Sequence, residues 1–385
     1  ILINFYYDEE INEKNIEEYI QILKIGSKKK SGKGFGWGID LCCLYPWSNW
    51  NDAKKIKQII SDLKSINIKW VRIGISWRNV IPLLHGNLTI AEVTNGMVDS
   101  LAKNISLGWH DAIIENLTSN NISILMVVGQ GYKGSLPLIG NSSDRVSPDK
   151  IGRENYLGWI YLYVRAVVNK YCSKIRYWQI ENELNAAGPT ATFFKWRTEE
   201  LSWWDPFFLK KLIATLSDAV YKEGKRAGLK LYTVHNFHTD VPGWEICVRA
   251  WLPYLDVIGI DTYPNYLLGW LQVGWVVGLK VLFAKLLSDK RPVWVIETGF
   301  PTAPKERGFD ENRQAKYLES AASSAYNFGA SVFIWFTITS SEVNQFPWYE
   351  PQAVESYWGI IKPGANVTVY TKAWYAYESI INSLD

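Results

Sequence analysis

Two glutamates stand at the ends of apolar runs in widely separated parts of the sequence. Glu183 follows Asn182 after the run 178–180, and Glu297 ends the run 292–297. Retaining cleavage of a glycosidic bond needs two carboxyl groups about 5–5.5 Å apart, one to protonate the leaving oxygen and one to attack the anomeric carbon. The two glutamates therefore indicate paired-carboxylate chemistry, provided that the fold brings them together.

Eight short apolar runs alternate with helical patterns along the chain. The runs are near-continuous, which is typical of parallel strands covered by helices on their outer face. We expect strands at 35–41, 70–76, 123–128, 175–180, 229–234, 257–261, 293–296 and 331–336. Eight strand-helix units close a barrel, so the sequence predicts an α/β fold, a (β/α)8 TIM barrel over 34–385. A doubly wound open sheet is the alternative.

A separate segment precedes the predicted barrel. Apolar residues at helical spacing within 8–24 predict an amphipathic helix, and 26–33 is rich in Gly, Ser and Lys. We therefore expect residues 1–33 to form an N-terminal helix and a basic linker.

The overall charge excludes some partners, while the aromatic content favours another. With 41 basic and 38 acidic residues the net charge is +3, which gives no indication of a nucleic-acid partner. The chain has 20 Trp, 22 Tyr and 14 Phe, and the flat apolar face of Trp matches the C–H face of a sugar ring. Carbohydrate is thus the expected partner. Six tryptophans in or near the expected catalytic-face loops are candidate sugar platforms: Trp47, Trp50, Trp77, Trp203, Trp204 and Trp348.

Several features favour an extracellular or cell-surface location. The sequence has six Asn-x-Ser/Thr sequons, and it begins with Ile1, as a trimmed or processed chain would. Its four cysteines match neither a disulfide-rich scaffold nor a CxxC metal spacing. Residues 266–287 are apolar but interrupted by Gln272, Lys280 and Lys285, so we expect an amphipathic helix that could contact a membrane or partner surface.

The active site of a (β/α)8 barrel lies at the carboxyl ends of its strands. The candidate site residues at these positions are Asp40, Arg72, Gln130, Asn182, Glu183, His235, Asp261, Tyr263, Glu297 and Trp335. Arg72 and Tyr263 could both donate to Glu297 and keep it ionised, while the nearby negative charge would help Glu183 to hold its proton. Asn182 could donate to a sugar 2-hydroxyl.

Two residue patterns leave alternatives open. Glu181 lies two positions before Glu183, and a shift in strand register would exchange their roles, although the Asn-Glu order favours Glu183. His235 and His238 have an H-x-x-H spacing that could bind a metal. Because the chain has only four His and the first strand offers no His pair, we expect no metal, and His235 would bind sugar or support the site. The expected chemistry needs no organic cofactor either.

Taken together, Asn182-Glu183, Glu297, Arg72, Tyr263 and Trp335 resemble clan A of the glycoside hydrolases. These are (β/α)8 retaining enzymes that include cellulases, mannanases and galactanases. The resemblance covers the chain from about residue 34 onward. It implies that Glu183 is the acid/base, that Glu297 is the nucleophile, and that Trp335 floors the subsite of the reacting sugar.

Two positions depart from the pattern of family 5 cellulases in this clan. Those enzymes usually have a His after strand three and another two residues before the strand-six Tyr, where this chain has Gln130 and Asp261. The segment 296–301 is instead similar to families that act on galactan or laminarin. The resemblance therefore leaves the family within the clan open.

The expected function is retaining hydrolysis of a β-linked oligo- or polysaccharide by double displacement. A transglycosylase would use the same residues, because only the acceptor differs. A barrel without catalytic activity that binds glycan at a cell surface, with 266–287 as its contact, is a further alternative. The pattern does not specify the oligomeric state.

Overall fold

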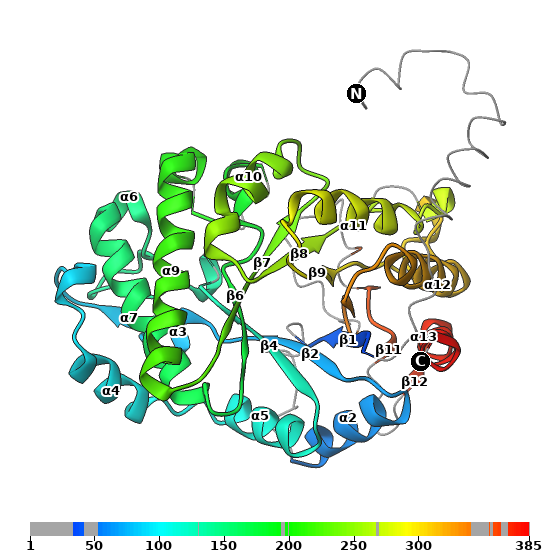
Figure 1. Ribbon diagram of the computed structural model, residues 1–385, viewed down its shortest axis with the longest axis horizontal. Helices are drawn as coiled ribbons and strands as arrows, with labels where there is room; N and C mark the ends of the chain where they lie inside the picture. The colour runs from blue at the N-terminus through cyan, green and yellow to red at the C-terminus, as the bar shows by residue number, and fades with distance from the viewer. Residues whose placement is uncertain are drawn as a thin grey trace.

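The core of the protein is a closed barrel of eight parallel strands. The strands lie in the centre of the ribbon diagram (Figure 1). This computed structural model describes residues 34–41, 53–129, 131–193, 197–198, 200–266, 269–339, 354, 357–362 and 369–384. The barrel strands are β1 (Gly36–Asp40), β2 (Trp70–Gly74), β4 (Ser123–Val128), β6 (Tyr177–Ile180), β7 (Tyr232–His238), β8 (Val257–Asp261), β9 (Val293–Glu297) and β10 (Val332–Trp335). Their order round the barrel is β1-β10-β9-β8-β7-β6-β4-β2, which confirms the predicted (β/α)8 barrel.

Helices follow the strands and cover the outside of the barrel (Figure 1). The α-helices are α2 (Ala53–Ser65), α3 (Trp77–Val80), α4 (Asn95–Asn104), α5 (Trp109–Ser119), α6 (Pro148–Ile151), α7 (Arg153–Tyr171), α8 (Ala187–Thr192), α9 (Pro206–Ala227), α10 (Trp244–Trp251), α11 (Val276–Leu287), α12 (Glu311–Asn327) and α13 (Lys372–Leu384). Short 3-10 helices include η6 (Leu184–Ala186), η7 (Leu201–Trp204) and η9 (Gly269–Leu271). Two small sheets pair β3 (Leu83–Leu84) with β5 (Leu138–Ile139), and β11 (Ile361–Lys362) with β12 (Val369–Tyr370).

The fifth barrel strand lies later in the chain than the predicted 229–234. Helix α9 ends at Ala227 and is capped by Gly228, which has the left-handed backbone that glycine adopts at low cost. Strand β7 begins only at Tyr232. The strand then continues to His238, which pairs with Asp261 of β8. The predicted strand stopped before the polar residues His235 and Asn236. Both are buried, however, and both pair with residues of β8.

Aromatic rings fill the amino-terminal end of the barrel interior. The Trp70 ring lies 5.0 Å from Tyr177 and 4.7 Å from Trp294, measured between centroids. A Cβ atom on Gly36 would come within 2.6 Å of the Trp70 ring, so glycine is required beside it. This plug of Trp70, Tyr177 and Trp294 closes one end, and the polar side chains collect at the carboxyl end.

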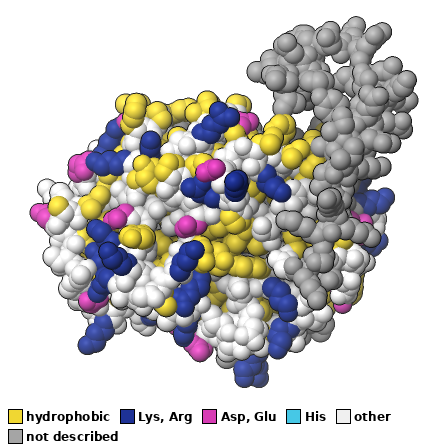
Figure 2. Space-filling view, viewed as in Figure 1, with side chains coloured by type: hydrophobic (Ala, Val, Ile, Leu, Met, Phe, Trp, Pro, Cys, Tyr) yellow, Lys and Arg dark blue, Asp and Glu magenta, His cyan; other side chains and the backbone are white. Residues whose placement is uncertain are grey.

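The apolar segment predicted at 266–287 is helical only in part. It contains η9 and then α11, which starts at Val276. Among the described residues, no helix is both long and apolar enough to cross a bilayer. Figure 2 shows hydrophobic side chains along the edge of the molecule over α9, α10 and α11, with Lys and Arg between them. The exposed apolar residues of η9 and α11 and the residues between them are Trp270, Leu271, Trp275, Phe283 and Leu286.

Several sequence expectations fall outside the described residues. They are the N-terminal helix and linker at 1–33, the site candidate Gln130, the platforms Trp47, Trp50 and Trp348, and the cysteines Cys42 and Cys43. The two described cysteines, Cys172 and Cys247, are free thiols.

Candidate active site

The chain leaves β6 through a turn that contains two glutamates with left-handed backbones. Glu181 has φ 59° and Glu183 has φ 46°, on either side of Asn182. Left-handed conformations are uncommon for residues other than glycine and cost free energy. The turn directs the two carboxyl groups to different surroundings, so it decides which glutamate reaches the mouth of the barrel.

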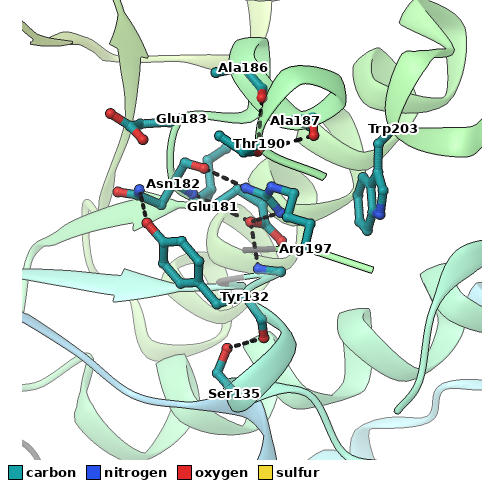
Figure 3. Close-up of polar contacts among 12 residues, drawn as sticks. Tyr132, Ser135, Glu181, Asn182, Glu183, Ala186, Ala187, Thr190, Arg197 and Trp203 are labelled. Carbon is teal, nitrogen blue, oxygen red and sulfur yellow. Dashed lines mark hydrogen bonds and ion pairs between the residues drawn. The ribbon is translucent and has the colours of Figure 1, made fainter. Parts of the chain in front are cut away.

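Glu181 points away from the mouth and is enclosed by protein. Its side chain is fully buried, accepts a hydrogen bond from the Gly131 N–H at 3.0 Å, and pairs with Arg197 at 3.6 Å. Arg197 also donates to the Asn182 carbonyl at 2.6 Å. Figure 3 shows the Glu183 side chain directed away from Arg197, whereas Glu181 reaches toward it. The Glu181–Arg197 pair therefore supports the turn, and Glu183 is the residue presented to the site.

Three carboxyl groups converge at the mouth of the barrel. Oxygen atoms of Glu183, Asp261 and Glu297 all lie within 4.8 Å of one another. Glu183 is 6% exposed and Glu297 is 7% exposed, so both glutamates are largely shielded from water. The structure thus brings together the two glutamates expected from the sequence and adds a third acid between strands β6 and β9.

Arg72 connects three of the predicted site residues with Gln179. Its Nη1 contacts Asp40 and lies 2.6 Å from Glu297 Oε1, and its Nη2 donates to Asn182 Oδ1 at 2.6 Å. Its Nε donates to Gln179 Oε1 at 2.8 Å. Since one guanidinium offers five donors in a fixed plane, Arg72 fixes these side chains relative to one another.

The carboxylate of Glu297 is held at both of its oxygens. The Tyr263 hydroxyl donates to Oε2 at 2.7 Å, on the side opposite Arg72. The ring of Tyr263 is itself fixed by stacking on Trp358, with centroids 4.7 Å apart. Both donors expected from the sequence therefore contact this group, and its orientation is set before any substrate arrives.

The protonation state of Glu297 differs from the expectation. Burial, assisted by the negative charges of Glu183 and Asp40, raises its pKa to about 7, although Arg72 and the Tyr263 hydrogen bond act in the opposite direction. Both donors lower the pKa of Glu297 as predicted, but burial outweighs them, so the net shift of the pKa is upward. Desolvation outweighs them because several acids share a single arginine.

Asp261 is the most deeply buried acid of the three. One of its oxygens accepts a hydrogen bond from Asn236 Nδ2, and Oδ1 has no hydrogen-bond partner among the described residues. Burial, together with the charges of Glu297 and Glu183, raises the pKa of Asp261 well above its ordinary value. The protonated form of Asp261, which could donate a hydrogen bond into the cluster, is therefore favoured by its surroundings.

An amide network underlies the carboxyl cluster. Asn236 Oδ1 accepts hydrogen bonds from Gln179 Nε2 at 2.7 Å and from the Glu183 N–H at 3.1 Å. Asn236 Nδ2 donates to Asn182 Oδ1 at 2.7 Å. Gln179 and Asn236 are not among the predicted site residues. A polar residue within an apolar barrel strand is the signal that could have identified both.

Two predicted site residues do not face the mouth. The buried His235 ring lies 5.2 Å from Trp251 of α10, its Nδ1 bonds the Ile180 carbonyl at 2.7 Å, and burial lowers its pKa to about 3. A sugar-binding role for His235 is therefore wrong, and only support of β6 remains. Trp335 is also fully buried and packs against Tyr317 of α12.

The aromatic residue that faces the site is Phe336, which directly follows β10. Side chains alternate along a strand, so Trp335 points outward and Phe336 inward. The Phe336 ring lies 6.4 Å from Tyr263 and 5.2 Å from Trp358, and it is half-buried. The expected position of Trp335 beside the site is therefore wrong, and Phe336 occupies that position instead.

The described tryptophans also divide into core and surface residues. Trp77 and Trp203 are buried and belong to the core, so they are not surface platforms. Trp204 is 52% exposed.

Among the described residues, the carboxyl groups of Glu183, Asp261 and Glu297 are close enough together to hold a metal ion. Carboxylate oxygens suit hard cations such as Mg²⁺ and Ca²⁺. Two of the three carboxyl groups, Asp261 and Glu297, have raised pKa values, which disfavours the ionised form a metal needs. The absence of a metal remains an expectation.

Comparison with known proteins identifies relatives of the fold but not of the sequence. No family model matches the chain, and no curated protein matches it. A glycoside hydrolase of group GH5_18 from Streptomyces cattleya, in complex with GlcNAc, is 13% identical with a TM-score of 0.66, covering 91% of this chain and 80% of its own. A β-glucosidase from Thermotoga maritima, in complex with cyclophellitol, is 12% identical with a TM-score of 0.60, covering 92% of this chain and 99% of its own.

A family 39 glycoside hydrolase from Bacteroides cellulosilyticus WH2 is 14% identical with a TM-score of 0.58, covering 91% of this chain and 64% of its own. At these identities the likeness shows the fold. It is the barrel fold of clan A glycoside hydrolases, which confirms the structural part of the resemblance seen in the sequence.

Proposed function

We propose that the chain is a retaining glycoside hydrolase that cleaves β-linked oligo- or polysaccharides, with Glu183 as acid/base and Glu297 as nucleophile. The observation that carries this proposal is the approach of the two carboxyl groups, whose oxygens lie within 4.8 Å at the barrel mouth. Direct attack on the anomeric carbon suits a separation of about 5–5.5 Å, whereas an interposed water needs about 6.5–9.5 Å. A fold shared with glycoside hydrolases adds support.

The hydrogen bonds around the two glutamates support the division of labour. Glu297 is oriented at both oxygens by Arg72 and Tyr263, as a nucleophile must be. In the described part of the chain, the Glu183 carboxyl accepts no hydrogen bond, so its oxygens are available to a leaving group and then to water. Only its backbone N–H is fixed, by Asn236.

The proposed reaction has two steps. The ionised Glu297 forms a bond to the anomeric carbon while Glu183 passes its proton to the glycosidic oxygen, and the leaving sugar departs as an alcohol. Glu183, now a carboxylate, then takes a proton from water as the water oxygen attacks the anomeric carbon and Glu297 leaves as a carboxylate. Asn182 uses one Nδ2 hydrogen on the Tyr132 hydroxyl, and the other is available to a sugar 2-hydroxyl.

Aromatic rings line the route to the reacting groups. Phe336, Tyr263 and Trp358 contact one another beside Glu297. Apolar ring faces match the C–H faces of β-linked sugars, which supports a carbohydrate substrate. A transglycosylase would share this chemistry and differ only in the acceptor of the second step.

A panel of activated aryl β-glycosides tests the proposal. We expect the wild type to cleave at least one, Glu183→Gln to lower kcat/KM on the order of 10²–10⁴-fold, and Glu297→Gln to abolish turnover. Glu154→Gln serves as control, because Glu154 is a surface glutamate paired with Lys211. Unchanged activity in Glu297→Gln would overturn the nucleophile assignment.

Product stereochemistry separates the mechanistic alternatives. Proton NMR should show the β-anomer as the first product, and the α-anomer would overturn the retaining mechanism. A wild type that binds a β-glycan but cleaves none of the panel would instead identify a glycan-binding barrel.

The sequons support action outside the cell. Asn87, Asn104, Asn121 and Asn141 are exposed, whereas Asn116 uses its side-chain amide to bond the Ala112 carbonyl within α5. The first four are therefore the candidate glycan acceptors. A fall in apparent mass after enzymatic removal of N-glycans from native protein would support this location, and an unchanged mass would argue against it.

A further inference from the structure

Trp204 presents one flat ring face at the surface while its other face rests on the backbone. A Cβ atom built on Gly188 would lie 2.4, 2.6 and 2.7 Å from three atoms of the Trp204 ring, Cδ2, Cε2 and Cε3. These similar distances place the Gly188 Cα against the face of the indole rather than its edge. Only glycine allows this contact, and the residue is still 52% exposed.

The orientation of the ring is fixed by its neighbours. The indole Nε1 donates to Thr192 Oγ1 at 3.2 Å. Trp203, the preceding residue, is 1% exposed and anchors η7 in the core, where its Nε1 donates to Thr198 Oγ1 at 3.2 Å. Arg153 Nε also donates to the buried Ser202 Oγ at 2.8 Å. Trp204 is therefore held in place before it meets a ligand, and a rigid ring loses little entropy on binding.

The Gly188 contact of Trp204 lies on the same connection after β6 as Glu183, the proposed acid/base. Gly188 is five residues after Glu183, and η6 and the start of α8 link the two without a break. With a helical rise of about 1.5–2 Å per residue, Gly188 lies roughly 8–10 Å from Glu183. The ring and the catalytic carboxyl are thus joined through one short segment of the chain.

We infer that Trp204 is a sugar-binding platform outside the catalytic pocket, which takes the C–H face of one residue of a β-linked oligosaccharide. The inference deepens the proposed function and rests on it. Phe193, next to Thr192, and Leu201, in the same 3-10 helix as Trp204, are exposed apolar residues as well. An occupant continuous with the substrate fits this position, because the platform belongs to the connection that carries Glu183.

Affinity gel electrophoresis tests the platform without any need for hydrolysis. The probes are soluble mixed-linkage β-glucan, galactomannan and galactan, each cast in a native gel. We expect at least one to retard the wild type. Trp204→Ala should weaken that retardation about tenfold, which corresponds to about 1.4 kcal/mol, and Trp204→Phe should restore part of it by keeping a flat ring.

Trp275→Ala is the matched control, because Trp275 is 53% exposed but belongs to the α11 side of the molecule. It should be retarded as strongly as the wild type, and Glu183→Gln should be retarded equally. Equal retardation of Trp204→Ala and wild type would overturn the platform, as would the absence of retardation in every gel. Loss of retardation in Trp204→Ala from a protein that hydrolyses nothing would keep the platform and reject the proposed enzyme.

Kinetics on the identified substrate give a second reading. Trp204→Ala should raise KM several-fold for long oligosaccharides and leave kcat/KM for an aryl glycoside unchanged. A change in oligomeric state of Trp204→Ala, seen by size-exclusion chromatography with light scattering, would instead identify the surface as a contact between copies of the chain and overturn the inference.

Discussion

Arg72 Nη1 lies 2.6 Å from Glu297 Oε1, yet burial raises the pKa of Glu297 to about 7. The cation is shared with Asp40 and Asn182, so its charge does not offset the loss of water around the carboxyl group. The raised pKa of the proposed nucleophile therefore lies close to neutral pH.

The first consequence is a pH limit on activity. Only ionised Glu297 can attack, so kcat/KM for an aryl glycoside should fall as the pH drops through about 7. Arg72→Met removes the cation that lowers the pKa, so it should move this limb to higher pH. A limb that stays near pH 4 in the wild type would contradict the raised pKa.

The contribution of Glu297 to the free energy of unfolding should fall as the pH rises, whereas activity should increase. Because the folded state raises the pKa of Glu297 above its unfolded value, the protonated form is favoured by folding and stability is lost as the pH rises from about 4.3 to about 7. Glu297→Gln mimics the protonated acid and should add on the order of 2–4 kcal/mol to the free energy of unfolding at pH 8, and much less at pH 4. Urea denaturation at both pH values measures this, and an equal effect at both would count against it.

Substitution by Gln should affect stability at Glu181 but activity at Glu183. Glu181→Gln leaves Arg197 as a buried charge without its carboxylate, which should cost about 3–5 kcal/mol of stability. Glu183→Gln should leave the free energy of unfolding nearly unchanged while it removes activity. Urea denaturation and aryl glycoside assays on both variants would reveal the reverse pattern if the roles were exchanged.

Removal of metal ions should leave activity unchanged. The proposed chemistry needs only protons and carboxyl groups, and burial raises the pKa of Asp261, which disfavours the ionised form that a metal needs. Dialysis against EDTA followed by assay in metal-free buffer measures this. Loss of activity that Mg²⁺, Ca²⁺ or Zn²⁺ restores would assign a cation to Glu183, Asp261 and Glu297.

The apolar surface of α11 should mediate the surface association expected from 266–287. The helix contains two lysines and no acidic residue, and Leu286 is 74% exposed, which suits an anionic membrane surface. We expect co-sedimentation with phosphatidylglycerol vesicles, and loss of it in Leu286→Glu. Tyr221→Glu on α9, where Tyr221 is 65% exposed, is the control. If wild-type protein stays in the supernatant, the association is excluded for this lipid.

Much of the barrel could be predicted because its strands are the apolar runs themselves. The order of side chains within each strand was harder to predict. His235 and Trp335 point outward, and Asn236 and Phe336 point inward, because alternation along a strand decides the face. A motif identifies a strand end, but only the register of the pleat identifies which of two adjacent residues faces the mouth.

Other features depend on contacts that no local pattern reveals. Arg197 lies in the connection after β6 and reaches back to Glu181 and the Asn182 carbonyl, so its position follows from the path of the chain. The protonation of Glu297 and Asp261 depends on how many acids share one cation and on how much water is excluded. Both are properties of the assembled barrel.

The ring plug of Trp70, Tyr177 and Trp294 determines how water travels to the site. Because these rings fill the amino-terminal end of the barrel, the water of the proposed second step should reach the site from the carboxyl end, where the sugar also binds. A second sugar waiting there would compete with water, so occupancy of the entrance would set the ratio of hydrolysis to sugar transfer.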